Sequence, residues 1–224
     1  MPAEFVYSQS MPFIFPPVYP ILDASCIPQS DRAEFLRTLG SSLAEAGVTL
    51  LEYRNKTGSN AEILEDATIL RAAMPGKNIK LILDDRVDLI AQTGFDGVHV
   101  DAGDVSPRAA RELLGPESII GTFGGSEALV PGILSEPADY FSIGPVYATT
   151  TKQTSKPPIG SEGIRRLRQD AGLDPVLVAA GGITLAAAQA VLAAGATTVA
   201  VSAAIFNTPD PASELRIWLK SLAR

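Results

Sequence analysis

The chain alternates between two kinds of segment eight times, and this alternation constrains its fold more than any other feature. Short apolar runs rich in β-branched residues predict strands, and each is followed by a segment with the apolar spacing of a helix. The strands are predicted at 18–22, 48–53, 79–83, 97–100, 118–122, 140–143, 175–179 and 198–201. The helices are predicted at 31–46, 60–74, 86–92, 106–114, 126–135, 161–169, 184–194 and 212–222.

Strict alternation requires a parallel sheet, because each helix carries the chain back to the start of the next strand. An open doubly wound sheet could also hold eight strands, but the units are even in length and no GxGxxG turn follows the first strand. We therefore expect one α/β domain, a (β/α)8 TIM barrel over residues 18–224, a fold that 224 residues suit. Residues 1–17 form an N-terminal extension, which could pack under the barrel or mediate contacts.

The charge balance narrows the possible partners. The formal net charge is -7, so no basic surplus exists to attract a nucleic acid or an anionic membrane, although a few local cations could still bind a phosphorylated metabolite. The single cysteine, Cys26, excludes a disulfide framework and is expected to pack as a small apolar residue. No apolar run is long enough to span a membrane, and the first seventeen residues, which include Glu4, do not resemble a signal peptide. We expect a cytoplasmic protein whose oligomeric state is open, with a homo-oligomer as one option.

Barrels of this kind carry their active sites at the carboxyl ends of the strands. The second strand ends in LLEYRNK, where alternation places Glu52, Arg54 and Lys56 on one side. Two cations and a carboxylate at the barrel mouth suit a phosphate-bearing ligand with a polar ring. A solvated strand end is an equally simple interpretation of the spacing.

Acidic residues follow the third and fourth strands, in LILDDR and GVHVDAGD. Asp84 and Asp85 are natural ligands for Mg²⁺, although a pair of aspartates could also cap the next helix. Asp101 and Asp104 follow the neighbouring strand, so Asp85 and Asp104 could hold one metal ion between them. His99, the only histidine, lies inside a strand and is expected to be buried and structural.

A long loop bounded by prolines follows the sixth strand and contains ATTTK. Thr149, Thr150, Thr151 and Lys152 bring three hydroxyls and an ammonium group to the barrel rim. Together with backbone N–H groups, these suit a pyrophosphate, and long loops in compact domains tend to be functional. The alternative is a solvated, threonine-rich loop.

The last two strands are followed by small residues. Gly181 and Gly182 lead into a helix, and Val201 and Ser202 begin a short helical turn. Glycines let backbone N–H groups approach an anion, and the loops after the seventh and eighth strands are the usual phosphate site of this fold. The pattern predicts a site for a phosphoryl group.

Several of these motifs, in this order, resemble the thiamine phosphate synthase family. The resemblance runs from the first strand to the eighth and rests on YRNK, DDRVDLI, GFDGVHVDAGD, DYFSIGPVYATTTK, AAGGIT and VAVSAAI. It implies the coupling of a hydroxymethylpyrimidine pyrophosphate to a thiazole phosphate, with Mg²⁺ and release of pyrophosphate. It also implies catalytic cations at Arg54 and Lys152, and metal ligands at Asp85 and Asp104. The substrate-binding residues it implies are Glu52, Arg54, Lys56, Asp84, Thr149, Thr151, Lys152, Gly181, Gly182, Val201 and Ser202.

The chain departs from the family pattern at the mouth of the barrel. Glu52 stands where the family usually has glutamine, and Asp84 where it has asparagine. Phe123 and Gly125 stand where it has a small hydroxyl residue and a histidine. These departures keep two alternatives open: a thiazole tautomerase, and a barrel that binds thiamine precursors without catalysis. The tautomerase depends on that histidine, and retention of Asp85, Asp104 and TTTK favours pyrophosphate chemistry.

Overall fold

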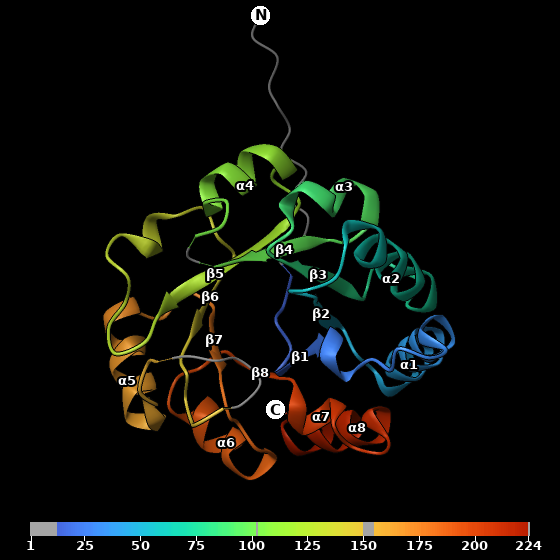
Figure 1. Ribbon diagram of the computed structural model, residues 1–224. Helices are drawn as coiled ribbons and strands as arrows, with labels where there is room; N and C mark the ends of the chain where they lie inside the picture. The colour runs from blue at the N-terminus through green and yellow to red at the C-terminus, as the bar shows by residue number, and fades with distance from the viewer. Residues whose placement is uncertain (1–12, 102, 150–154, 224) are drawn as a thin grey trace, which may run out of the picture.

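The computed structural model describes residues 13–101, 103–149 and 155–223, in which eight parallel strands form a closed barrel (Figure 1). Each strand pairs with the next one along the chain, and the last pairs with the first. The strands are β1 (Val18–Asp23), β2 (Leu50–Arg54), β3 (Lys80–Asp84), β4 (Gly97–Val100), β5 (Ile119–Gly125), β6 (Tyr140–Ile143), β7 (Leu177–Ala180) and β8 (Thr198–Val201). The helices are α1 (Arg32–Ala46), α2 (Asn60–Ala73), α3 (Ile90–Thr93), α4 (Pro107–Leu114), α5 (Gly160–Ala171), α6 (Leu185–Ala193), α7 (Ala203–Phe206) and α8 (Pro211–Ser221).

The predicted (β/α)8 barrel is confirmed, and one predicted helix is wrong. Between β5 and β6 the structure has a single 3-10 turn, η3 (Ile133–Ser135), instead of a helix over 126–135. The chain folds back on the end of β5, where the Val130 N–H donates to the Gly124 carbonyl at 2.9 Å. Pro131 cannot donate the hydrogen bond that a helix requires, and Gly132 adopts a left-handed φ of 75°.

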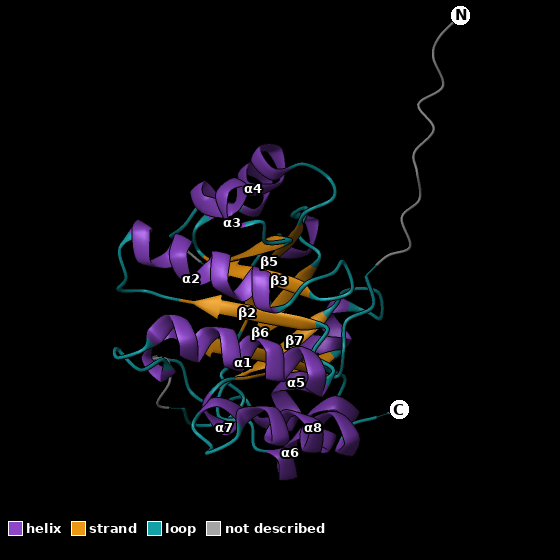
Figure 2. Ribbon diagram, turned by 90° about the vertical axis from the view of Figure 1, so that its right-hand side faces the viewer, coloured by secondary structure: helices purple, strands orange, loops and turns teal. Residues whose placement is uncertain are grey.

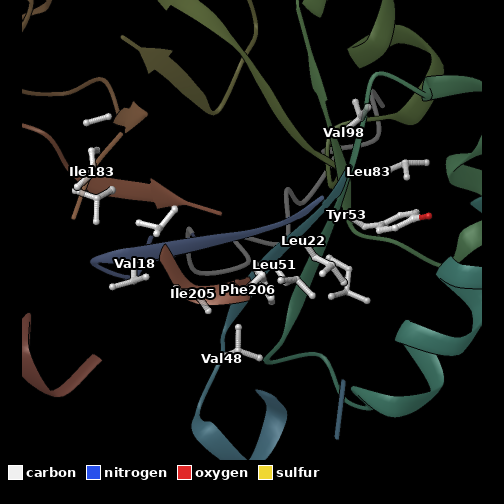
Figure 3. Close-up of a cluster of buried hydrophobic side chains, with 14 of the residues drawn as sticks. Val18, Leu22, Val48, Leu51, Tyr53, Leu83, Val98, Ile183, Ile205 and Phe206 are labelled. Atoms are coloured by element: carbon white, nitrogen blue, oxygen red, sulfur yellow. The ribbon is translucent and has the colours of Figure 1, made fainter. Parts of the chain in front are cut away.

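Two layers of apolar side chains hold the barrel together. The outer layer lies between strands and helices, and Figure 3 shows part of it, including Leu22, Leu51 and Leu83. The inner layer fills the barrel and consists of Tyr19, Leu50, Ile82, Ile119, Tyr140, Val178 and Ala200. Because both faces of each strand are covered, the strands are almost continuously apolar in sequence. Figure 2 shows helices stacked outside the strands.

Two large aromatic side chains form much of the barrel interior. Tyr140 lies where Gly121 leaves room for it, because a Cβ atom at position 121 would overlap the tyrosine ring. Phe15, which precedes β1, packs against the Tyr140 ring with centroids 5.4 Å apart, and Phe13 packs on Phe15 at 5.1 Å. The described end of the N-terminal extension therefore contributes to the interior core. The division of the chain at residue 17 stays a prediction.

A polar brace recurs at the start of three odd-numbered strands. In β5, the Ile120 N–H donates to the Asp139 carboxylate at 2.7 Å, and Arg111 of α4 donates to the same oxygen at 2.7 Å. Equivalent braces join Arg71, Asp96 and Leu81 of β3, and Arg168, Thr197 and Leu177 of β7. Each arginine also donates to carbonyls of the loop that enters its strand. These braces fix the barrel at the end opposite the site.

None of the helices in the described ranges has both the length and the apolar character needed to cross a membrane.

Candidate active site

A cavity of about 720 Å³ opens at the carboxyl ends of the strands. This volume lies within the usual range for small-molecule sites. Its lining includes Glu52 and Arg54 from β2, Asp84 from β3, and Gly181 and Gly182 after β7. Strand-end residues that are far apart in the sequence therefore share one cavity, as the barrel geometry requires.

The floor of the cavity is a buried hydrogen-bonded network. The Tyr19 hydroxyl donates to Glu52 Oε2 at 2.9 Å and lies 2.9 Å from the Tyr140 hydroxyl. The Tyr140 hydroxyl in turn lies 3.1 Å from His99 Nδ1. Burial, and then the negative charge of Asp84, raises the pKa of Glu52 to about 7. This carboxyl therefore binds a proton more readily than an exposed glutamate does.

His99 is buried and hydrogen-bonded, as the sequence predicts, and it also lines the cavity. Its Nε2 lies 3.6 Å from Asp101 Oδ1. Burial alone would lower the pKa of His99, but the hydrogen bond to Asp101 and the charges of Glu52 and Asp84 outweigh it and raise that pKa. The network thus carries acidic groups on both sides of the imidazole.

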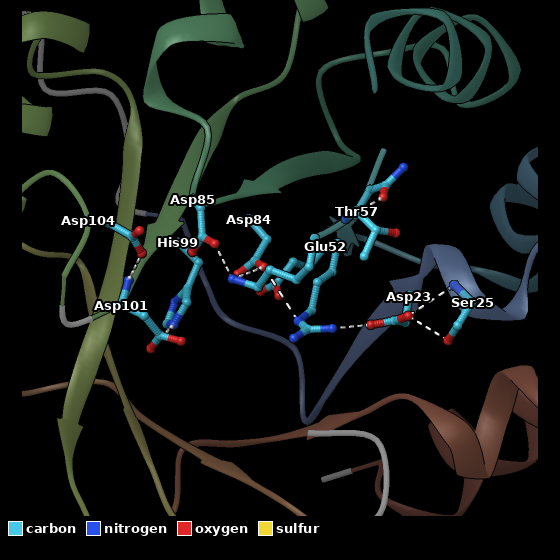
Figure 4. A network of polar contacts seen from close by, with 12 residues as sticks. Asp23, Ser25, Glu52, Thr57, Asp84, Asp85, His99, Asp101 and Asp104 are labelled. Atoms are coloured by element: carbon cyan, nitrogen blue, oxygen red, sulfur yellow. Dashed lines mark hydrogen bonds and ion pairs between the residues drawn. The ribbon is translucent and has the colours of Figure 1, made fainter. Parts of the chain in front are cut away.

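Beside this floor, cations and carboxylates alternate across the barrel mouth (Figure 4). Arg54 forms an ion pair with Asp23, and its Nε lies 3.4 Å from Asp84 Oδ2. Lys56 Nζ lies 2.8 Å from the same Asp84 oxygen and also contacts Asp85. Burial raises the pKa of Asp84 despite the positive charge of Lys56. Ion pairs therefore hold the side chains of Arg54 and Lys56 at the barrel mouth, where both could contact a ligand anion.

The far side of β2 has a structural role. Tyr53 and Asn55 point away from Glu52 and Arg54, and the Tyr53 hydroxyl donates to buried Asp66 of α2. The predicted alternation along β2 is thus what the structure shows, while the role of its cavity-side residues in binding substrate stays a prediction.

Asp85 and Asp104 approach one another at the ends of β3 and β4. Asp104 is exposed at the rim, but partial desolvation, and then a hydrogen bond with Asp85, raises its pKa. Asp85 holds a left-handed backbone with φ 63°, uncommon for a residue with a side chain, and its N–H donates to the His99 carbonyl at 2.8 Å. Its Oδ1 is buried and has no hydrogen-bond partner within the described ranges. Two adjacent carboxylates need a shared proton or a cation between them, so this pair fits a divalent metal ion.

The described residues do not converge on a metal with three acidic, histidine or cysteine side chains. Mg²⁺ commonly binds one or two carboxylates and completes its shell with water and substrate phosphates. The pair of Asp85 and Asp104 has that character.

The other half of the cavity is built from small residues. Gly181 and Gly182 adopt left-handed φ angles of 98° and 64°. A Cβ at 181 would lie 2.8 Å from Pro145 Cβ, and one at 182 would overlap the Ala148 carbonyl. Ser202 lines the cavity, and its hydroxyl is buried without a hydrogen-bond partner in the described ranges. Glycines that expose backbone N–H groups, together with a hydroxyl lacking a partner, are typical of an anion site.

Thr149 and Val201 also line the cavity. Thr150, Thr151 and Lys152 lie outside the described residues, so their predicted roles stay untested. Sequence reasoning missed several residues of the site. Tyr19 and Tyr140, which line the cavity, and Asp23, which pairs with Arg54, could have been found by extending strand alternation to β1 and β6. It also missed Lys156, which has no strand-end motif.

The fold and cavity define a (β/α)8 barrel with a strand-end site suited to phosphorylated small molecules. Residues 18–205 match the family model described as thiamine monophosphate synthase. The thiamine-phosphate synthase of Koribacter versatilis is 39% identical over 87% of this chain and 90% of that protein. That of Agrobacterium fabrum is 40% identical over 80% of this chain and 82% of that protein. The chain therefore belongs to the thiamine monophosphate synthase family.

Solved structures agree with this placement. The thiamine phosphate pyrophosphorylase of Pyrococcus furiosus superposes with a TM-score of 0.72 at 27% identity, covering 92% of this chain and 96% of that one. An orotidine 5'-phosphate decarboxylase from Pyrococcus horikoshii superposes with a TM-score of 0.61 at 16% identity, covering 92% and 99%, which shows the shared fold alone.

Proposed function

We propose that this protein is a thiamine-phosphate synthase, a transferase that joins hydroxymethylpyrimidine pyrophosphate to a thiazole phosphate. The observation that supports the proposal is one cavity, in a chain of this family, whose two halves carry different arrangements of groups that suit an anion. One arrangement is the cation and carboxylate cluster beside Asp85, and the other is the glycine half at Gly181 and Gly182. Two phosphorylated substrates need two such places.

In the proposed reaction the C–O bond to pyrophosphate breaks, and the thiazole nitrogen forms a C–N bond to the pyrimidine methylene carbon. Arg54, Lys56 and Lys152 stabilise the negative charge that develops on the departing pyrophosphate. Glu52 faces the pyrimidine from the cavity floor, where its carboxyl can bond an amino group. Backbone N–H groups near Gly181 and Gly182 hold the thiazole phosphate with Ser202. No step requires a strong base, so positioning and charge stabilisation dominate.

Asp85 and Asp104 would hold Mg²⁺, which, when bound, would neutralise part of the pyrophosphate charge. The closeness of the two carboxyl groups, which contributes to the raised pKa of Asp104, and the buried Asp85 oxygen described above support this assignment. We also propose that the protein acts in the cytoplasm on small metabolites. Nucleic-acid and membrane partners are not expected, because the net charge of the chain is -7.

The chain lacks the histidine on which the thiazole tautomerase alternative depends. Position 125 is a glycine whose φ is 154°, and a Cβ there would overlap the Ala128 carbonyl. The described loop around it supplies no imidazole that could move a proton on the thiazole.

The test is pyrophosphate release from the purified protein with both thiamine precursors, with and without Mg²⁺, together with identification of thiamine phosphate as product. We expect turnover that requires both substrates and the metal. Thiazole phosphate binding with no turnover would refute the synthase and support a binding protein whose departures at Glu52, Asp84 and Phe123 removed catalysis.

A further inference from the structure

Lys156 lies over the face of Phe123 at the edge of the cavity. Its Nζ is 3.6 Å from the ring centroid, and both residues line the cavity. Phe123 is in β5, whereas Lys156 belongs to the connection between β6 and α5. The partly buried ring holds the end of a flexible side chain near the site, because a cation over an aromatic face is attracted by the ring quadrupole.

The charges that line the cavity are unevenly divided between its halves. The half built from β1 to β4 supplies the lining carboxylates Glu52, Asp84 and Asp101, together with Arg54. The half built from β5 to β8 supplies no lining carboxylate among the described residues. Lys156 is its single charged lining residue in those same ranges. Among the described lining residues of that half, the only charge that a ligand anion meets is therefore the positive charge of Lys156.

The same half contains the groups that suit a phosphoryl ligand. The unpartnered hydroxyl of Ser202 and the left-handed glycines at 181 and 182 face the cavity. Backbone N–H and hydroxyl donors alone leave the charge of a phosphoryl group unbalanced. A lysine is the usual complement, acting as a point charge on a phosphate held by backbone donors.

We propose that Lys156 is a substrate-binding residue that pairs with a phosphoryl group in the β5–β8 half of the cavity, and that Phe123 positions its ammonium group. This deepens the proposed function and rests on it only in naming which substrate carries that group. The phenylalanine that replaces the family's small hydroxyl residue thus supplies a contact indirectly, through the cation that it holds.

The first experiment measures anion binding and does not depend on turnover. Inorganic phosphate and inorganic pyrophosphate are titrated calorimetrically into the unchanged protein, Lys156→Met, Lys156→Arg, Phe123→Leu and Lys77→Met. Lys77 is exposed in the connection that enters β3, at the opposite end of the barrel, so its variant removes the same charge away from the site. Circular dichroism confirms that each variant is folded.

We expect Lys156→Met to weaken binding of at least one anion about tenfold, since a charge-assisted hydrogen bond is lost. Phe123→Leu should weaken the same anion about two- to fivefold, the value of an exposed cation–π contact. Lys156→Arg should stay near the unchanged protein, and so should Lys77→Met. Equal affinities of Lys156→Met and Lys77→Met for both anions would overturn the proposal.

The second experiment identifies the phosphoryl group. If pyrophosphate binding alone is weakened, Lys156→Met should raise KM for the pyrimidine substrate. If phosphate binding is weakened, it should raise KM for the thiazole phosphate. A protein that binds the anions as expected but never turns over would refute the synthase while leaving the assignment of Lys156 intact.

Discussion

Replacing Glu52 by glutamine should stabilise the protein increasingly as the pH rises. Glu52 is 3% exposed, and burial, followed by the charge of Asp84, raises its pKa from 4.5 to about 7. Between these values the folded protein retains a proton that the unfolded chain has released. The stability that this group contributes is therefore fully present below about pH 4.5 and is lost as the pH rises towards 7.

The size of the effect follows from the two pKa values. One pKa unit corresponds to about 1.36 kcal/mol, so the ionised carboxyl costs roughly 3 kcal/mol of unfolding free energy well above pH 7. About 1 kcal/mol of that cost is already present at pH 5. The unchanged protein should therefore lose about 2 kcal/mol relative to Glu52→Gln between pH 5 and pH 8. Glutamine keeps the shape and an oxygen that can accept from Tyr19, but it has no charge to bury.

The assay is urea unfolding of both proteins at pH 5, 6, 7 and 8. Trp218, the single tryptophan, is buried against the barrel and reports by fluorescence, while far-UV circular dichroism reports the helices. Coincident transitions justify a two-state free energy. Glu117→Gln, at an exposed site, controls for the change in net charge. If the stabilities of the unchanged protein and Glu52→Gln follow parallel lines across this range, the buried carboxyl is not protonated as argued.

Three further substitutions test other parts of the structure. Asp104→Ala should lower Mg²⁺-dependent turnover roughly a hundredfold. The unfolding free energy should change little, because the residue is exposed at the rim. Turnover like that of the unchanged protein would exclude Asp104 as a metal ligand. Lys152→Ala should raise KM for the pyrimidine pyrophosphate about tenfold in steady-state kinetics, and an unchanged rate would remove it from the site. Arg111→Met should lower the unfolding free energy by about 2 kcal/mol, since it strips donors from Asp139 and three loop carbonyls. Arg165→Met, which breaks an exposed helix pair, should change it by less than about 0.5 kcal/mol, and equal effects of the two would refute the brace.

The fold was predictable because its signal is local and repeated. Each strand and helix has its own apolar spacing, and eight repeats leave few alternatives to a barrel. The wrong helix over 126–135 shows where that signal fails. Its apolar residues fit a helix, but the return of the chain to Gly124 and the turn at Pro131 and Gly132 determine the conformation.

The site was predictable where strand alternation and barrel geometry act together. They bring Glu52, Arg54 and Lys56 to the cavity side of β2, and Asp85 beside Asp104. The features of the site that the sequence did not predict depend on contacts between distant segments. The pairing of Arg54 with Asp23 joins residues 31 positions apart, and the position of Lys156 over Phe123 depends on the course of a loop. No periodicity in the sequence encodes either contact.

In an acidic protein that binds anionic substrates, the negative charge of carboxylates near the site must be compensated, because it would otherwise repel the substrates. Here several carboxylates at the mouth are already compensated: Asp23 by Arg54, Asp84 by Arg54 and Lys56, and Asp85 by Lys56. Burial raises the pKa of Glu52, which lowers the negative charge that it carries near neutral pH. Arg54 and Lys56 are consequently paired with carboxylates, which are anions like the ligand. A phosphoryl group that binds these two cations replaces the carboxylates as their partner.

This replacement favours a ligand that brings its own divalent cation, because the metal can then bind the carboxylates that the lysine and arginine release. The opposite half, with glycines, a serine hydroxyl and Lys156, has no carboxylate lining the cavity in the described ranges. The two halves therefore suit two anions of different charge, which is the requirement of a reaction that joins a pyrophosphate ester to a phosphate monoester.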